Sequence, residues 1–175
     1  MNASAEPRDG SSSVCTKPEC APIHYHWYRF EARITLIDSV KYAVEAEGLT
    51  GEDVDRILGE VRARLLALVD GLLTPIVHIK GPMETVTDLW VYEIRAGIEI
   101  GEGTNFAVRV YHVEPSKLRS THGTTVVGLH LHAKDLDGTS KEIRDLQDAE
   151  LQVARDRYFK GQGSSWGGAT ILPQA

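Results

Sequence analysis

The sequence predicts an α+β protein with the element order β-α-α-β-β-β-α, in which helices pack on an antiparallel-rich sheet. Two observations support this prediction. Apolar residues between positions 50 and 75 recur at helical spacing, whereas those between 88 and 133 fall in three β-rich runs. The 175 residues, of which 42% are hydrophobic and 25% charged, are typical of one globular domain with its own core.

The first two elements are expected between residues 24 and 47. In the stretch HYHWYRFEARI (24–34), aromatic and apolar residues alternate with polar ones, the period-two pattern of a half-buried strand. Asp38 and Ser39 can cap a short helix over 39–47, which Gly48 would end.

A longer helix is expected after Thr50 and should end before Pro75. Its apolar residues form one stripe along the helix. They are Val54, Ile57, Leu58, Val61, Leu65, Leu68, Val69 and Leu72.

Three strands follow, at 88–100, 105–113 and 124–133, and a last helix is expected over 141–159. The segment GIEIGEGTNF, between the first two of these strands, is rich in glycine. It lacks the lysine and the following helix of a phosphate-binding loop, so a hairpin turn is expected there.

The two ends of the chain differ in composition from its middle. Residues 1–22 are rich in serine, proline and small polar residues, which predicts a flexible leader. Residues 23–161 are predicted to form one domain, and residues 162–175 a loose tail. Cys15 and Cys20 lie in the predicted leader with the spacing C-x4-C. Because no other cysteine exists to complete a zinc site, both are interpreted as incidental thiols.

Charge and hydropathy restrict the function classes. The net charge of −6 disfavours a protein that binds nucleic acid phosphates through a broadly basic surface. A local basic patch can still bind RNA. No apolar run is long enough for a transmembrane helix, and the N-terminus lacks the apolar middle of a secretory signal. A cytoplasmic location is therefore expected.

Four segments occur in an order typical of one family of small proteins. They are LWVYEIR (89–95), FAVRVYH (106–112), VVGLHLHAKD (126–135) and TSKEI (139–143). Together with the predicted element order, they resemble the RelE/ParE superfamily of toxins, and in detail its HigB-like, phage-derived branch. The resemblance covers about residues 76–160 by motif and the earlier helices by pattern alone.

This resemblance implies the toxin component of a type II toxin–antitoxin system. The implied activity is metal-independent cleavage of mRNA by an endoribonuclease that needs no cofactor and acts on free message or at the ribosome. The implied partners are a cognate antitoxin protein, mRNA and the ribosome. The resemblance implies neither a membrane partner nor DNA binding by the protein itself.

The resemblance also assigns roles to individual residues. Arg109 matches the arginine that holds the scissile phosphate, and His130 and Lys134 match the histidine and first lysine of the third motif. Asp135 stands where a second lysine is expected, and His132 where an aromatic residue is usual. The implied catalytic residues are Arg109, His130, His132 and Lys134, and the implied phosphate-binding residues are Lys80 and Arg95.

The residues alone lead to a similar hypothesis. Side chains alternate along a strand, so His130, His132 and Lys134 should project from one face. Leu129, Leu131 and Ala133 should project from the other face, toward a buried core. Two imidazoles and an ammonium on one face offer an acid, a base and a cation for RNA cleavage. Arg109 on a neighbouring strand would complete the set.

Three alternatives remain open from the sequence. The histidines can be ordinary polar-face residues, with Arg109 paired to Glu93 or Glu114. The chain can be a non-catalytic protein of the same fold that acts on a protein target, which the acidic charge and Asp135 favour. Finally, two H-x-H pairs placed side by side can bind a metal. These pairs are His24 with His26 and His130 with His132.

Overall fold

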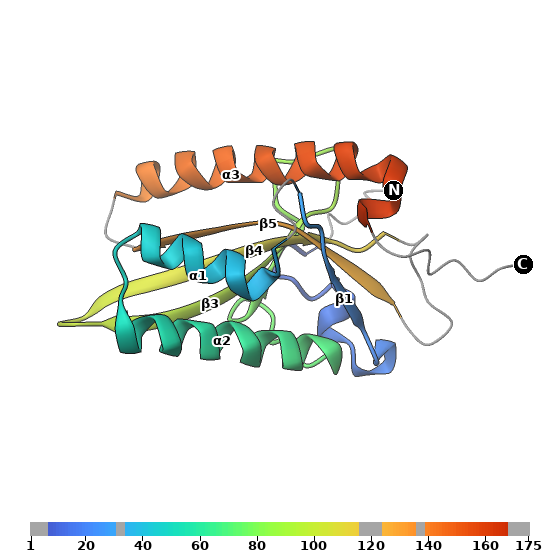
Figure 1. Cartoon of the computed structure of the whole chain (residues 1–175). Helices are drawn as coiled ribbons and strands as arrows, with labels where there is room; N and C mark the ends of the chain where they lie inside the picture. Colours follow the sequence, from blue (N-terminus) through green and yellow to red (C-terminus); the bar gives the residue numbers. More distant parts are fainter. Residues whose placement is uncertain (1–6, 31–33, 116–123, 136–138, 168–175) are drawn as a thin grey trace, which may run out of the picture.

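The computed structural model describes residues 7–30, 34–115, 124–135 and 139–167, and it has three layers (Figure 1). The middle layer is a five-stranded sheet in the order β1-β5-β4-β3-β2. Neighbouring strands are antiparallel except β1 and β5, which pair in parallel. The strands are β1 (His24–Trp27), β2 (Ile79–Lys80), β3 (Tyr92–Ile100), β4 (Thr104–Val113) and β5 (Thr125–Asp135).

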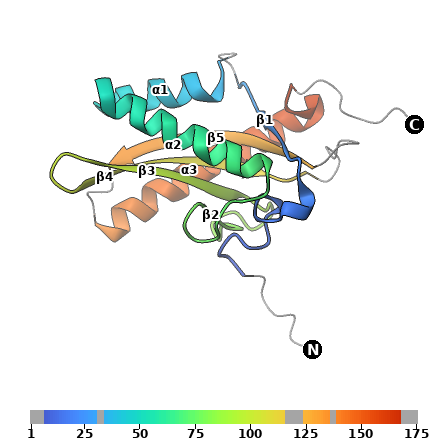
Figure 2. The same ribbon diagram turned by 90° about the horizontal axis from the view of Figure 1, so that it is seen from below.

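Three α-helices cover the sheet. Helices α1 (Leu36–Ala46) and α2 (Gly51–Val69) lie on one face, and α3 (Ser140–Gly161) lies on the other (Figures 1 and 2). The α+β class and the predicted element order are therefore confirmed, with β2 as an additional strand. Two residues are too few to show a periodicity, which is why the sequence did not predict β2.

The helix boundaries follow from capping. Thr35, rather than the predicted Asp38 or Ser39, caps α1, because its hydroxyl accepts a hydrogen bond from the amide of Asp38. Helix α2 begins directly after Thr50, as predicted, and ends at Val69. A full capping box between Thr139 and Glu142 opens α3.

The first strand is shorter than predicted. β1 ends at Trp27, although the Tyr28 amide still donates a hydrogen bond to the carbonyl of Gly128 in β5. The rings of Tyr28 and Phe30 pack on each other, with centroids 5.7 Å apart. The guanidinium of Arg157 on α3 lies over the Phe30 ring. The aromatic residues after Trp27 therefore pack at the side of the sheet, while residues 31–33 of the predicted strand lie outside the described part of the chain.

The predicted hairpin between β3 and β4 is confirmed. The turn joins Ile100 to Thr104, and Gly101 and Gly103 in it have φ values of 56° and 85°. Glycine adopts this left-handed region without the steric penalty of other residues.

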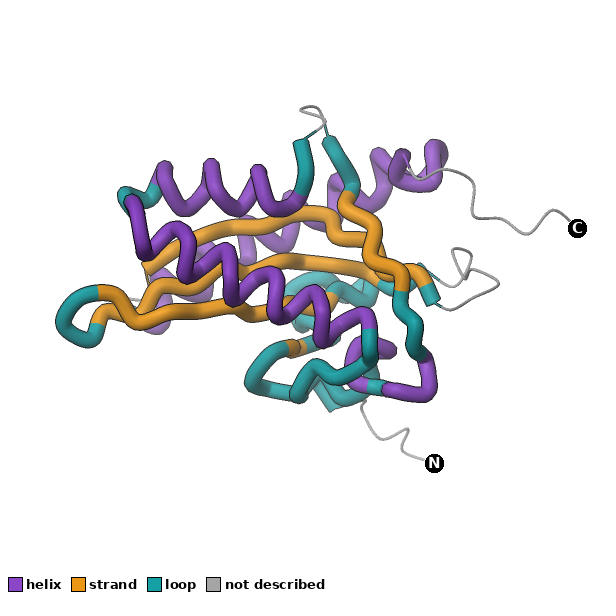
Figure 3. Tube along the Cα trace, turned by 60° about the horizontal axis from the view of Figure 1, so that its bottom comes forward, coloured by secondary structure: helices purple, strands orange, loops and turns teal. Residues whose placement is uncertain are grey.

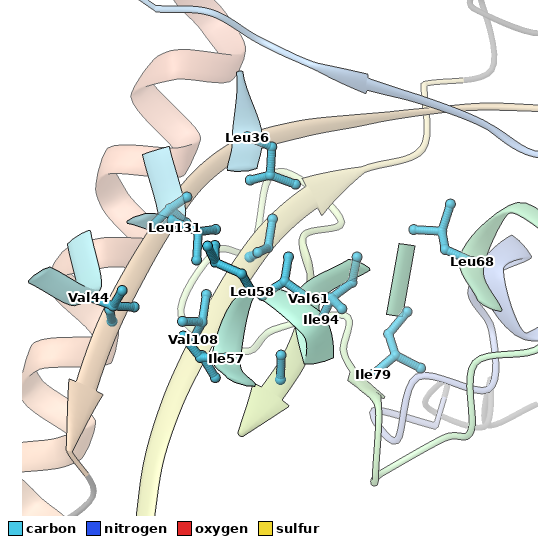
Figure 4. Packing of buried hydrophobic residues seen from close by; sticks show 14 of the residues in the cluster. Leu36, Val44, Ile57, Leu58, Val61, Leu68, Ile79, Ile94, Val108 and Leu131 are labelled. Atoms are coloured by element: carbon cyan, nitrogen blue, oxygen red, sulfur yellow. The ribbon is translucent and has the colours of Figure 1, made fainter. Parts of the chain in front are cut away.

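Two apolar cores lie on the two faces of the sheet. The larger one fills the space between the sheet and helices α1 and α2, as Figure 4 shows. Its residues include Leu36, Val44, Ile57, Leu58, Val61, Leu68, Ile94, Val108 and Leu131. The smaller core lies under α3 and contains Tyr111, Val127, Leu129, Leu151, Ala154 and Trp166.

The N-terminal segment corrects one expectation. Residues 7–22, predicted to be part of a flexible leader, pack beside the C-terminal end of α2 through two short 3-10 helices, η1 (Val14–Thr16) and η2 (Pro18–Cys20) (Figure 3). Cys15 is fully buried, and its carbonyl accepts a hydrogen bond from the amide of Leu73. Such a segment has no helical or strand periodicity, so its composition alone resembled a leader.

The predicted loose tail is also corrected in part. Residues Gln162–Gly167 form a further 3-10 element, η4, and Trp166 in it is fully buried. The Trp166 indole donates a hydrogen bond to the carbonyl of Tyr158. Burying a large aromatic side chain anchors this part of the tail on α3.

A β-bulge shapes the sheet near its centre. Tyr111 pairs with His130, but the next residue, His112, pairs with Gly128, so that Leu129 is an extra residue in β5. The bulge places Leu129 and His130 on the same side of the sheet, where Leu129 enters the core under α3 and His130 contacts α3. This corrects the prediction that Leu129 shares the opposite face with Leu131 and Ala133, which lie in the core under α1 and α2.

None of the helices within the described residues combines the length and the apolar character needed to cross a bilayer.

Candidate active site beneath helix α3

The strand registers bring all six residues singled out in the sequence onto the sheet face that α3 covers. Cross-strand partners lie side by side on one face, and here they form two adjacent rows. One row contains Arg95, Arg109 and His132, and the other contains Lys80, Glu93, Tyr111 and His130. Lys134 lies next to these two rows, opposite Ala107.

Glu93 is the centre of the charged network. Its side chain is fully buried and accepts hydrogen bonds from Arg95 Nε at 2.6 Å and from the Arg109 guanidinium at 3.3 Å. A third donor is the side-chain amide of Gln147 on α3, at 2.5 Å. The pairing of Arg109 with Glu93, one of the alternatives open from the sequence, is therefore present.

His130 is paired with Glu150 of α3. The imidazole Nε2 and a carboxylate oxygen form a short hydrogen bond, and the two side chains are 14% and 25% exposed. This hydrogen bond lowers the pKa of Glu150 below its ordinary value, against the opposing effect of burial. Glu150 is thus a carboxylate at neutral pH and fixes the orientation of the His130 ring.

The second histidine on this face, His132, contacts Tyr111. Burial is the main cause that lowers its pKa to about 4, so the ring is neutral at neutral pH. Its Nδ1 lies 3.3 Å from the Tyr111 hydroxyl, and burial raises the pKa of that phenol. The Tyr111 ring stacks near both histidines, at 6.4 Å from His130 and 6.0 Å from His132 between ring centroids.

A pocket of about 360 Å³ opens at the edge of β5, beyond the end of β1. Aromatic side chains line it, and Arg29 and Arg157 add positive charge. His130 also lines this pocket, so this residue borders a cavity at the side of the molecule. The aromatic residues are Trp27, Tyr28, Phe30 and Tyr42.

Lys80 lies at the opposite end of the same face. It lines a second pocket, of about 550 Å³, together with Arg8 and Arg144. Glu84 and Asp148 line this pocket too, so its charge is mixed. The Glu93 network separates Lys80 from His130, because Glu93 and Tyr111 stand between them in the row.

The two H-x-H pairs do not lie side by side. His26 is opposite Val127 in the parallel pairing of β1 and β5, and β1 ends before the level of His130. The Nε2 atom of His26 lies 2.9 Å from the carbonyl oxygen of Trp166. The strand arrangement assumed for a metal site between the two pairs is therefore absent from the described residues.

A different metal-ligand group lies on the other face of the sheet. The ligand atoms of Cys15, His112 and Glu114 all lie within 4.8 Å of one another. Cys15 Sγ is 3.8 Å from His112 Nε2 and 3.9 Å from a Glu114 oxygen, which is itself 3.4 Å from that Nε2. The sequence did not predict this group, because Cys15 is 97 residues away from His112.

The sequence analysis named Glu93 as a partner of Arg109 but missed Glu150, the carboxylate of α3 that pairs with His130. Glu150 lies on a helix that the sequence predicted, and its place one turn before Ala154 of the buried stripe is a signal that it faces the sheet.

No family model, curated protein or solved structure matches this chain.

Proposed function

We propose that the protein is a metal-independent endoribonuclease of the RelE/HigB type, and that His130 is its general base. The observation that carries this proposal is the position of His130. A carboxylate on α3 fixes this histidine, which lines a pocket of aromatic and basic side chains.

The pocket has the chemistry of a single-stranded RNA site. Unstacked bases bind on aromatic side chains, and each stacked base contributes about 1–3 kcal/mol. Trp27, Tyr28 and Phe30 supply such surfaces beside His130. Arg157, whose guanidinium also donates to the carbonyl of Leu129, places a positive charge where a phosphate would lie.

The reaction uses the substrate's own hydroxyl as nucleophile. His130 takes the proton of the ribose 2′-OH, the 2′-oxygen bonds to phosphorus, and the bond between phosphorus and O5′ breaks. The leaving O5′ takes a proton from solvent. The products are a 2′,3′-cyclic phosphate and a 5′-hydroxyl end, and Glu150 stabilises the imidazolium that forms on His130.

The remaining residues have supporting roles in this proposal. His132 is neutral and holds Tyr111, which packs against His130. Arg109 is a positioning residue, because its guanidinium pairs with buried Glu93 and is only 14% exposed. Arg157 is therefore the better candidate than Arg109 for direct contact with the phosphate.

The test is cleavage of end-labelled RNA by the purified chain, with and without ribosomes. The His130→Gln variant should lose activity by about 100-fold or more, the contribution typical of a general base. His24→Gln is the matched control, since His24 is exposed on β1, and it should cleave as the original chain does. Cleavage of free RNA should survive a chelator, and full activity of His130→Gln would refute the assigned role.

A second candidate is a non-catalytic protein of this fold that binds a protein target. Arg95 and Arg109 share the Glu93 carboxylate, and the net charge of −6 opposes broad contact with phosphates. Large apolar side chains are exposed at the end of α2 and in the following loop, where a protein partner can bind. They are Leu66, Leu72, Ile76 and Val77. Absence of RNA cleavage in both assays would favour this candidate.

A further inference from the structure

Cys15, His112 and Glu114 bring three different metal-binding atoms together inside the protein. Cys15 is in η1, whereas His112 lies near the end of β4 and Glu114 directly after that strand. Cys15 and His112 are fully buried, and the side chain of Glu114 is 12% exposed. Thiolate, imidazole and carboxylate are the three ligand types that bind Zn²⁺ in proteins.

The distances between these atoms fit a tetrahedral ion. Typical zinc–ligand bonds to sulfur, nitrogen and oxygen at a tetrahedral angle give edges of about 3.6 Å for S···N, about 3.5 Å for S···O and about 3.3 Å for N···O. The corresponding distances in this group are 3.8, 3.9 and 3.4 Å. A shift of a few tenths of an ångström would therefore close the group around a zinc ion.

Direct hydrogen bonding explains the arrangement less well. A hydrogen bond between an imidazole N–H and a carboxylate is usually about 2.7–2.9 Å long, shorter than the 3.4 Å between His112 and Glu114. A cysteine–histidine catalytic pair does not fit either. Cys15 is fully buried, and Glu114 approaches the same imidazole nitrogen as Cys15, so it cannot orient the ring from the opposite side.

Neighbouring groups hold the carboxylate and the ring in place. The Ser13 hydroxyl donates to Glu114 Oε1 at 2.5 Å, and the Val14 amide donates to Oε2 at 3.2 Å. The His112 ring stacks on Tyr92, with centroids 5.5 Å apart and planes 20° apart. Contacts of this kind, one shell behind the ligands, orient the ligands of metal sites in proteins.

We propose that Cys15, His112 and Glu114 bind one zinc ion, with a water molecule as the fourth ligand. The water would come from a cavity of about 290 Å³ that Glu114 lines with Ser12 and Thr124. The charges balance, because a divalent ion offsets one thiolate and one carboxylate. Three protein ligands and one open position are the arrangement typical of zinc sites that bind an exchangeable ligand.

The bound ion would also link the N-terminal segment to the sheet. Cys15 belongs to the segment that packs beside α2, whereas His112 and Glu114 belong to β4 and the residue following it. Binding to the folded state alone stabilises a protein in proportion to the logarithm of ligand concentration over Kd. Zinc should therefore raise the melting temperature, which gives a readout independent of RNA cleavage.

The experiment titrates the metal-free, full-length chain with Zn²⁺ and, separately, with Co²⁺, whose thiolate complexes absorb visibly. One equivalent of zinc per chain and a thiolate-to-cobalt charge-transfer band are expected. Cys15→Ser should abolish the band, and Glu114→Gln should weaken zinc binding by about tenfold or more. Circular dichroism checks that each variant is folded, and Glu114→Gln provides the test if Cys15→Ser does not fold.

The chain supplies a matched control for each variant. Cys20→Ser removes the other thiol and Glu19→Gln an exposed carboxylate, and both residues are in η2, outside the group. Both controls should bind one zinc with unchanged affinity. The proposal is overturned if the original chain takes up no stoichiometric zinc at micromolar concentration. It is also overturned if Glu114→Gln and Glu19→Gln bind zinc equally well.

Discussion

Replacing Glu93 by glutamine should destabilise the protein far more than an ordinary lost ion pair does. Glu93 is fully buried and binds two arginines and Gln147. The substitution keeps the size of the side chain but removes its charge, which leaves Arg109 largely buried without a counterion. Breaking a buried pair by neutralising one partner costs about 3–5 kcal/mol, and we expect about 3 kcal/mol because Arg95 is partly exposed.

Urea denaturation followed by circular dichroism measures this loss. For a chain of this length, about 3 kcal/mol corresponds to a melting temperature lower by about 6–12 °C. Glu60→Gln is the matched control, since it breaks the partly exposed pair with Arg64 on α2 and should cost about 0.3–0.5 kcal/mol. Equal losses in the two variants would refute the assignment of Glu93 as the centre of the network.

Two further predictions concern pH and backbone packing. The pKa of His132 is about 4 in the folded protein and 6.5 without burial, so only the unfolded chain binds the proton between these values. The free energy of unfolding should therefore fall as the pH drops from about 6.5 to about 4, and denaturation at several pH values should show a smaller fall in His132→Gln. Gly71→Ala should destabilise the protein, because the added Cβ would lie 2.3 Å from the carbonyl oxygen of Lys17 and the φ of 68° is strained for alanine. Gly59→Ala, where the added Cβ meets open space within α2, should instead stabilise the protein by about 0.5–1 kcal/mol. Thermal unfolding of both variants measures the two effects. Equal effects would contradict the packing of the N-terminal segment on Gly71.

The regular elements were predictable from the sequence because each has its own period. The apolar stripe of α2 and the β-rich runs of β3, β4 and β5 identified these elements to within a few residues. The N-terminal segment was not predictable in this way. It packs through 3-10 turns and backbone contacts, such as that between Gly71 and Lys17, which leave no periodic pattern of side chains.

The candidate site was predictable only in part. Alternation along β5 correctly placed His130, His132 and Lys134 on one face but wrongly placed Leu129 on the other, because the sequence did not predict the bulge. The strand registers show that Arg109 shares the face of the histidines. The partners of these residues come from distant parts of the chain, as Glu150 does for His130. The group of Cys15, His112 and Glu114 was not predictable from the sequence, because Cys15 and His112 meet only through the packing of the N-terminal segment against the sheet.

The shortness of β1 has a functional consequence. Because β1 ends opposite Gly128, no strand of the described residues pairs with the second half of β5 on the side away from β4. The aromatic residues after Trp27 line the pocket there. α3 covers the sheet above Arg109 and Glu93, so in the proposed function a substrate would approach His130 from this edge. The proposal therefore assigns specificity to the aromatic pocket and the acid–base chemistry to the pair between β5 and α3. The network of Glu93, Arg95 and Arg109 joins β3 and β4, and Gln147 links it to α3. These contacts hold α3 against the sheet, which the hydrogen bond between Glu150 of α3 and His130 of β5 requires.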